Sequence, residues 1–157
     1  MITRWPTPYE YRRRLPHYQK SDRPIFVTFR KLTADPLPPV ARHLVLEHCL
    51  HDHGRTLLMH AVVVMPEHVH ILMTPLRDQN GWPIPLAKIL QLIKGVSARR
   101  INQLLGSEGP LWQDESFDHV LRSEESFEDK VEYIRQNPVR RRLAQTPEDY
   151  PWLWQDP

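Results

Sequence analysis

Residues 62–73 read VVVMPEHVHILM, two runs of apolar and β-branched residues separated by a proline and a glutamate. Such runs are typical of β-strands, and the short connection predicts an antiparallel hairpin. Successive side chains on a strand point to opposite faces, so His68 and His70 project from one face and Val69 from the other. Two neighbouring imidazoles could supply two ligands of a metal site or a polar catalytic surface. We favour this interpretation over hydrogen-bonded histidines of the core.

The hydrophobic periodicity on either side of this hairpin predicts seven elements. Strands are expected over 25–30, 55–65, 68–74 and 111–121, and helices over 39–52, 86–105 and 124–137. Ser123 is a candidate N-cap of the last helix, and Pro138 is expected to limit its end. The first six elements follow the order βαββαβ, which predicts an α+β fold: an antiparallel sheet with two helices on one face. The last helix is free to bring a further residue to the histidine pair.

The last predicted helix carries two polar residues that its apolar pattern does not explain. Phe127, Val131 and Ile134 form the buried stripe, and Tyr133 lies about a quarter turn or more off it. Asn137 follows Tyr133 by four residues, so the two are neighbours on one helix face. The alternative is a half-exposed surface tyrosine and an asparagine that merely ends the helix.

Length and composition indicate one globular domain spanning residues 1–157. Hydrophobic residues make up 40% of the chain and charged residues 25%, which are ordinary values. We expect a basic N-terminal arm over 1–23 and a tail over 138–157. The one cysteine, Cys49, shares a helical face with Ala41 and Val45, and a disulfide within the chain is excluded. No apolar run approaches the roughly 20 residues that cross a bilayer, and the N-terminus lacks the apolar stretch of a signal peptide, so a soluble cytoplasmic protein without membrane contact is expected.

The formal net charge is only +2, but the positive charges are clustered. A mostly acidic stretch from 108 to 132 masks the clusters in the sum. Each cluster alone is more simply a solvated surface, and together they are candidates for nucleic-acid contacts. The candidate contact residues are Arg12, Arg13, Arg14, Lys94, Arg99, Arg140, Arg141 and Arg142.

Two further groups have competing interpretations. His48, His51 and His53 surround Asp52 and could bind a metal, but solvated imidazoles at a helix C-terminus are the favoured interpretation. In the tail, Tyr150, Trp152 and Trp154 could stack on unpaired bases or close the core, and we expect at least one tryptophan in the core.

Several motifs together carry a resemblance to a known family. MPEHVH over 65–70 is followed by YIRQNPV over 133–139, and RRLPH over 13–17 precedes FVTFR over 26–30. LWQ over 111–113, FDHVLR over 117–122 and PEDYP over 147–151 extend the match. With these motifs the chain resembles the IS200-like single-tyrosine transposases of the HUH class, and more narrowly the REP-associated tyrosine transposases, from about residue 13 to its end.

The resemblance implies a ferredoxin-like core and an enzyme that nicks and joins single-stranded DNA near hairpins. It implies that His68 and His70 bind one divalent metal, Mg²⁺ or Mn²⁺, with Asn137 as the third protein ligand, and that Tyr133 is the nucleophile. Glu67 departs from the family, whose members often have asparagine there. His119 matches the pattern without an assigned role. The chain could act as a monomer or a homodimer.

A phosphodiester is a negatively charged, poor electrophile, so a divalent cation and a positioned nucleophile suit its cleavage. Tyrosine attack predicts a 5′-phosphotyrosine and a free 3′-hydroxyl, and the ester keeps the bond energy for rejoining. Imidazole ligands alone would favour zinc or another transition metal and magnesium prefers oxygen, whereas two nitrogens, an amide oxygen and waters suit manganese. Two alternatives stay open: a non-catalytic protein that binds DNA hairpins for regulation, and a metal-dependent nuclease that uses water.

Overall fold

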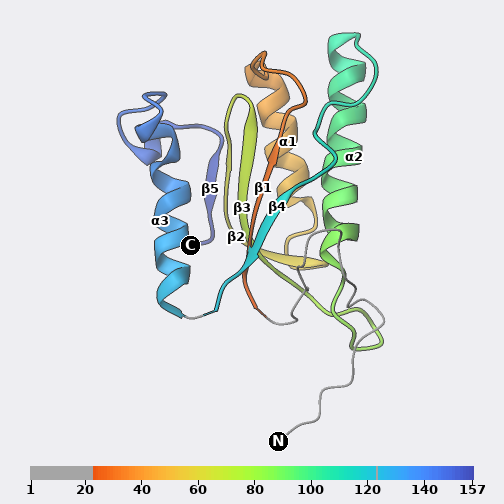
Figure 1. The fold of residues 1–157 in the computed structure, drawn as a ribbon, viewed down its shortest axis with the longest axis vertical. Helices are drawn as coiled ribbons and strands as arrows, with labels where there is room; N and C mark the ends of the chain where they lie inside the picture. Colours follow the sequence, from red (N-terminus) through yellow and green to blue (C-terminus); the bar gives the residue numbers. More distant parts are fainter. Residues whose placement is uncertain (1–22, 123) are drawn as a thin grey trace, which may run out of the picture.

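The computed structural model describes residues 23–122 and 124–157, and its centre is one antiparallel sheet of five strands in the order β4-β1-β3-β2-β5 (Figure 1). The strands are β1 (Ile25–Arg30), β2 (Leu57–Val64), β3 (His68–Pro75), β4 (Phe117–Val120) and β5 (Leu153–Gln155). The helices are α1 (Pro39–His51), α2 (Leu86–Leu105) and α3 (Glu124–Arg140), with a 3-10 turn, η1, at Pro147–Asp149. The predicted α+β fold with the order βαββαβ is confirmed.

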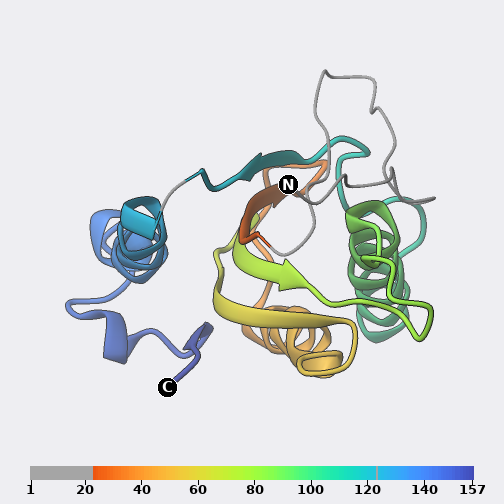
Figure 2. The ribbon, with the colours of Figure 1, turned by 90° about the horizontal axis from the view of Figure 1, so that it is seen from below.

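Helices α1 and α2 cover one face of the sheet, and α3 lies on the other (Figure 2). Alternation along the strands explains this arrangement, because β1 sends Ile25, Val27 and Phe29 toward α1 and α2. The apolar stripe of α1, which includes Cys49, is fully buried against them, as the sequence predicts. The opposite residues of β1 are therefore left to face α3.

A second, smaller core lies beneath α3. Val131 and Ile134 on that helix pack with Phe26, Val63 and other residues that the sheet presents on this side. Ile134 is fully buried, so the predicted stripe of the last helix is the side that contacts the sheet. The packing fixes the rotation of α3 about its axis and therefore fixes where its polar residues point.

The last helix does not end before Pro138, contrary to the sequence prediction. It continues to Arg140, and the amide N–H of Arg141 donates to the carbonyl of Asn137 at 3.1 Å. Proline in a helix removes one donor but adopts a helical φ, and Asn137 and Pro138 are both buried. Burial of this turn against the sheet offsets the lost hydrogen bond. The proposed N-cap, Ser123, lies outside the described residues.

The fourth strand is shorter than the predicted 111–121, because only Phe117–Val120 pairs with β1. Upstream of it, Trp112 forms an isolated bridge with Lys31 and packs edge-on against Phe29 at 4.8 Å. The segment before β4 is therefore an irregular connection tied to the first core.

The tail adds a fifth strand that the sequence did not predict. β5 pairs antiparallel with the outer edge of β2, and the Tyr150 hydroxyl donates to the carbonyl of Val64 at 2.7 Å. Tyr150 is buried, and Trp152 and Trp154 are half-buried against the cores. These aromatics belong to the fold, as expected for at least one tryptophan, rather than to a stacking surface. Among the helices that the structure describes, none is long and apolar enough to span a membrane.

Candidate active site

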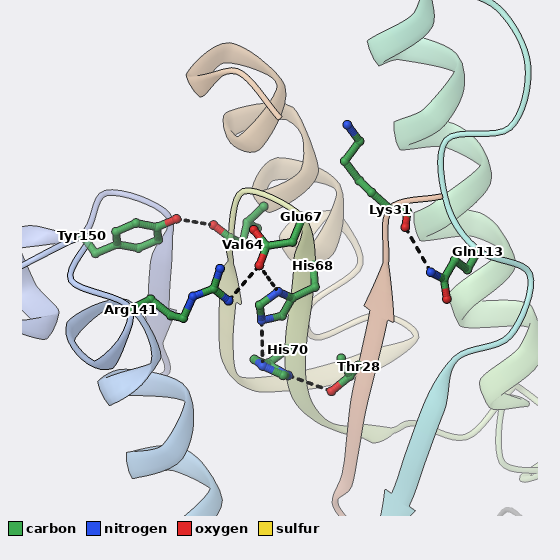
Figure 3. A network of polar contacts seen from close by, with 9 residues as sticks. All are labelled: Thr28, Lys31, Val64, Glu67, His68, His70, Gln113, Arg141 and Tyr150. Carbon is green, nitrogen blue, oxygen red and sulfur yellow. Dashed lines mark hydrogen bonds and ion pairs between the residues drawn. The ribbon is translucent and has the colours of Figure 1, made fainter. Parts of the chain in front are cut away.

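Strand β3 holds the two histidines at the centre of the sheet, on the face covered by α3 (Figure 3). His68 lies opposite Arg30 of β1, and His70 lies opposite Thr28. The two imidazoles are 3% and 4% exposed, with Nε2 atoms 3.1 Å apart. The alternation along the strand thus places both imidazoles together, as the sequence predicts, in a position shielded from bulk water.

The hydrogen bonds around the two rings direct both Nε2 atoms to one point. The Nδ1 of His68 donates to the Oε1 of Glu67 at 3.0 Å, which leaves its Nε2 as an acceptor. The Nδ1 of His70 lies 2.7 Å from the hydroxyl of Thr28. Because that hydroxyl can rotate to donate or to accept, His70 can either donate from Nε2 to His68 or turn an Nε2 lone pair to a cation. The site accommodates both tautomers without moving a ring.

Both histidines are held in the neutral form. Burial, together with the charges of His68 and Arg30, lowers the pKa of His70 to about 3. Burial also lowers the pKa of His68, against the opposing charge of Glu67. Neutral imidazole is the form that ligates a metal ion, so the protein environment prepares both rings for that role at neutral pH.

We expect the free energy of unfolding to fall in acid because of this burial. A histidine in the unfolded chain has a pKa near 6.5. Below that pH, His70 is therefore protonated in the unfolded chain but stays neutral in the folded protein. Stability should be complete above about pH 6.5 and decline as the pH falls toward 3, by up to about 1.4 kcal/mol per pH unit for this group. Urea unfolding at several pH values, with EDTA present, measures the decline. The uncharged His70→Gln variant should show a shallower decline, and an equal slope in both proteins would contradict the assignment.

Asn137 on α3 carries a polar atom that has no hydrogen bond in the described part of the chain. The residue is buried, and its Oδ1 has no partner. Leaving a buried amide oxygen unpaired costs free energy, so a ligand at this atom would offset that cost. Asn137 stands one helical turn after Tyr133 on the helix that covers the histidine face. This orphaned oxygen is the feature that a third metal ligand would have.

The donor set fits a divalent cation. Two nitrogens bound at right angles to one ion, each about 2.1 Å away, lie about 3.0 Å apart, close to the 3.1 Å between the two Nε2 atoms. No group of three His, Cys, Asp or Glu ligands occurs among the described residues, so a third protein donor at this point would be of another kind, such as an amide. Two nitrogens and one neutral oxygen leave positions for water and a phosphate oxygen.

Tyr133 lies against the histidine pair and is open to solvent. Its ring centroid is 5.4 Å from that of His70 and 5.8 Å from that of Phe26. The side chain is 38% exposed. Arg140 also contacts it, with its guanidinium 4.3 Å from the ring centroid and a donated hydrogen bond of 3.2 Å to the Tyr133 carbonyl. An accessible hydroxyl-bearing ring therefore stands beside the two candidate ligands.

Four cationic side chains surround this group. Arg30 raises the cost of a positive charge on both histidines, and Lys130 and Arg140 do so for His70, as Arg141 does for His68. The concentration of positive charge at one point suits a phosphate group. The sequence analysis missed Arg30 and Lys130, because isolated basic residues carry no signal. Arg30 ends the FVTFR motif, but its place beside the histidines follows from its register opposite His68.

Glu67 joins the histidine strand to the end of α3. Its Oε1 accepts from His68 and forms an ion pair with Arg141 at 2.8 Å (Figure 3). Although partial burial acts to raise it, the hydrogen bonds from Arg141 and His68 lower the pKa of Glu67. A carboxylate on the far nitrogen of a ligand histidine fixes its tautomer and increases its basicity. Glu67 thus contacts the candidate site through the Nδ1 of His68.

The remaining predicted residues lie elsewhere. Lys94 and Arg99 are on α2, on the opposite side of the sheet, and Lys94 donates to the carbonyls of Gln113 and Asp114. Arg142 is exposed just after α3, and Arg12 to Arg14 lie outside the described residues. Of the histidines around Asp52, His51 is exposed and hydrogen-bonds to Asp52 at 3.0 Å, and the Nδ1 of His53 accepts from the amide N–H of Met59 at 2.9 Å.

Comparison with solved structures places the fold. The chain superposes on a REP-associated tyrosine transposase bound to a REP hairpin with a TM-score of 0.69 and 21% identity, over 92% of this chain and 81% of the other. It also matches a bacterial tRNA(His) guanylyltransferase-like protein in complex with GTP, with a TM-score of 0.50 and 15% identity, over 84% and 68% of the two chains. The same sheet therefore serves different chemistries, and function has to be argued from the site.

A sequence relative points in the same direction. The chain is 25% identical over 97 residues to a protein of Haemophilus influenzae that carries the name of a REP-associated tyrosine transposase. The match covers 59% of this chain and 55% of the relative, so it spans about half of the relative's length. No family model matches the chain. The resemblance expected from the motifs is confirmed: the chain is similar to REP-associated tyrosine transposases in sequence and in fold.

Proposed function

We propose that this protein is a metal-dependent transposase-like endonuclease that nicks and rejoins single-stranded DNA beside hairpins through a 5′-phosphotyrosine. One observation carries the proposal: an accessible tyrosine ring lies 5.4 Å from His70 on the helix that also presents the unpaired oxygen of Asn137. A regulatory binding protein needs none of these groups together. The relative and the solved structure that carry the transposase name support the choice of a DNA hairpin as substrate.

In the proposed reaction, the Tyr133 oxygen forms a bond to phosphorus and the bond from phosphorus to the 3′ oxygen breaks. The tyrosine proton is lost, and the departing 3′ oxygen gains one, so that a 3′-hydroxyl and a 5′-phosphotyrosine result. A second 3′-hydroxyl can attack the tyrosyl ester in reverse. That step restores a phosphodiester and the tyrosine hydroxyl without ATP.

The chain's own residues orient the reacting groups. His68, His70 and Asn137 would hold Mg²⁺ or Mn²⁺, which when bound neutralises charge on the phosphate. Arg140 fixes the Tyr133 ring, and Glu67 fixes His68. Arg30 and Lys130 add positive charge where the phosphate has to lie. Positioning of this kind is a large part of the barrier reduction in phosphoryl transfer.

The test uses hairpins with single-stranded flanks, each labelled at one end, incubated with the full chain and Mn²⁺ and run on a denaturing gel. A 3′-end label should appear in a protein-linked band that protease digestion collapses. A 5′-end label should appear in a shorter free strand with a 3′-hydroxyl. Shortened free strands from both labels would indicate hydrolysis by water, and tight binding without cleavage in Mg²⁺ or Mn²⁺ would indicate a regulatory binder. Either result overturns the proposal.

A further inference from the structure

Phe117 on strand β4 is an exposed aromatic side chain in a fixed position. Its side chain is 59% exposed, the highest value among the large hydrophobic residues that the structure describes. Its neighbours Ser116 and Asp118 are buried, and β4 is paired with β1. Single exposed hydrophobic residues are common on protein surfaces, so the location of this ring matters more than its exposure. The backbone holds it rigidly while the ring meets solvent.

The strand register places Phe117 on the same face as the candidate active site. Phe117 lies opposite Thr28, and Thr28 lies opposite His70. Directly opposite residues of antiparallel strands project from one face, so the three side chains form a row across the sheet. With strands about 4.8 Å apart, Phe117 stands roughly 10 Å from His70. This is close enough to meet a nucleotide next to a phosphate at the histidines.

The described helices leave this part of the sheet face uncovered. Helix α3 packs over β2 and β3, with Tyr133 reaching Phe26 of β1, and α1 and α2 lie on the opposite face (Figure 2). Arg30, two residues after Thr28 on β1, is exposed on the same side, and its charge reaches both histidines. An aromatic ring and a cation therefore flank the open edge of the site.

We propose that Phe117 stacks on an unpaired nucleobase that adjoins the reacting phosphate, with Arg30 contacting the intervening backbone. The inference rests on the proposed function and adds a binding site for the single-stranded DNA that flanks the hairpin. A flat apolar ring beside a guanidinium matches the alternation of base and phosphate, and such stacking tolerates any base. It assigns the role of stacking platform to a residue of β4 instead of the aromatic tail, whose rings are buried or half-buried.

The test measures equilibrium binding in EDTA, so that cleavage does not interfere, to a hairpin whose flank carries one abasic site moved along it. In the wild-type protein one flank position should be critical, with an affinity loss of roughly 5- to 150-fold when its base is removed. Phe117→Leu should lose a similar factor on the intact flank and no longer respond to the abasic site. Phe117→Trp should keep the wild-type response, because it retains a ring that stacks.

A blunt hairpin without a flank is the matched control, and all three proteins should bind it equally. Equal binding of Phe117→Leu and wild type to the flanked hairpin overturns the inference, as does a loss of the same size on the blunt hairpin. A lower unfolding free energy or a changed oligomeric state in Phe117→Leu shows that the ring contacts protein, which also overturns it. Covalent-band formation by the wild type, measured separately, distinguishes failure of the stacking role from failure of the proposed function.

Discussion

Replacement of Tyr133 by phenylalanine should abolish the covalent protein–DNA band and reduce nicking by at least about 10³-fold, while hairpin binding is retained. The variant keeps the ring that contacts His70 and Arg140 and removes only the hydroxyl. Loss of a nucleophile commonly costs several orders of magnitude in rate. Because the ring is 38% exposed and the hydroxyl forms no hydrogen bond with the described residues, the free energy of unfolding should change by less than about 0.5 kcal/mol.

Single-turnover cleavage on denaturing gels gives the rate, and a mobility shift in EDTA gives the affinity. Tyr150→Phe serves as the matched control, because it removes a hydroxyl from a tyrosine that is buried in the tail. That variant should be less stable by about 1 to 2 kcal/mol and should still form the adduct. Nicking that persists in Tyr133→Phe would show that water is the nucleophile and that the tyrosine takes no part in the reaction.

Replacement of His70 by alanine should weaken divalent-metal binding by at least about 10-fold and reduce nicking by roughly 10²- to 10³-fold. The Nε2 of His70 lies 3.1 Å from the Nε2 of His68. Loss of a direct ligand should weaken metal binding at least as much as loss of a residue that only orients a ligand. Titration of Mn²⁺, followed by calorimetry or by the paramagnetic relaxation of water, measures the affinity without any turnover.

His60→Ala provides the comparison. His60 lies on β2, is half-buried and hydrogen-bonds to Thr74 at 2.7 Å, and its ring packs against Phe127 of α3. It is therefore another strand histidine that contacts α3, but it has no place in the histidine pair. Its replacement should leave the Mn²⁺ affinity unchanged within about 2-fold. Equal losses in the two variants would trace the effect to general loosening of the sheet.

The parts of the site that could be predicted are those that depend on periodicity within one element. The two-residue alternation of side chains along a strand placed His68 and His70 on one face. The helical period separated Tyr133 from the buried stripe of the last helix. The extension of α3 through Pro138 was missed, because its cause is tertiary burial of that turn. β5 was missed because it has only three residues, too few to show alternation, in a short stretch between Pro151 and Pro157.

Residues whose role depends on register could not be predicted. Arg30 and Phe117 join the site only because β1 lies between β3 and β4, and strand order and pairing are not visible in local sequence. The tail aromatics show the converse. A run of tryptophans and a tyrosine attracts attention in the sequence, but half or more of that surface is used to close the two cores.

The attachment of α3 to the sheet limits how far Tyr133 can move. The helix is preceded closely by β4, and it is followed by β5, so it is inserted between the two border strands of a single sheet. Because α3 is also packed against the sheet through Val131 and Ile134, movement of Tyr133 away from His70 would require this core to open. In the proposed reaction the 5′ end linked to Tyr133 thus stays beside His70, where the strand was cut. Strand exchange would then require the free 3′-hydroxyl end to leave and another to enter, while the protein holds the tyrosine-linked 5′ end in place.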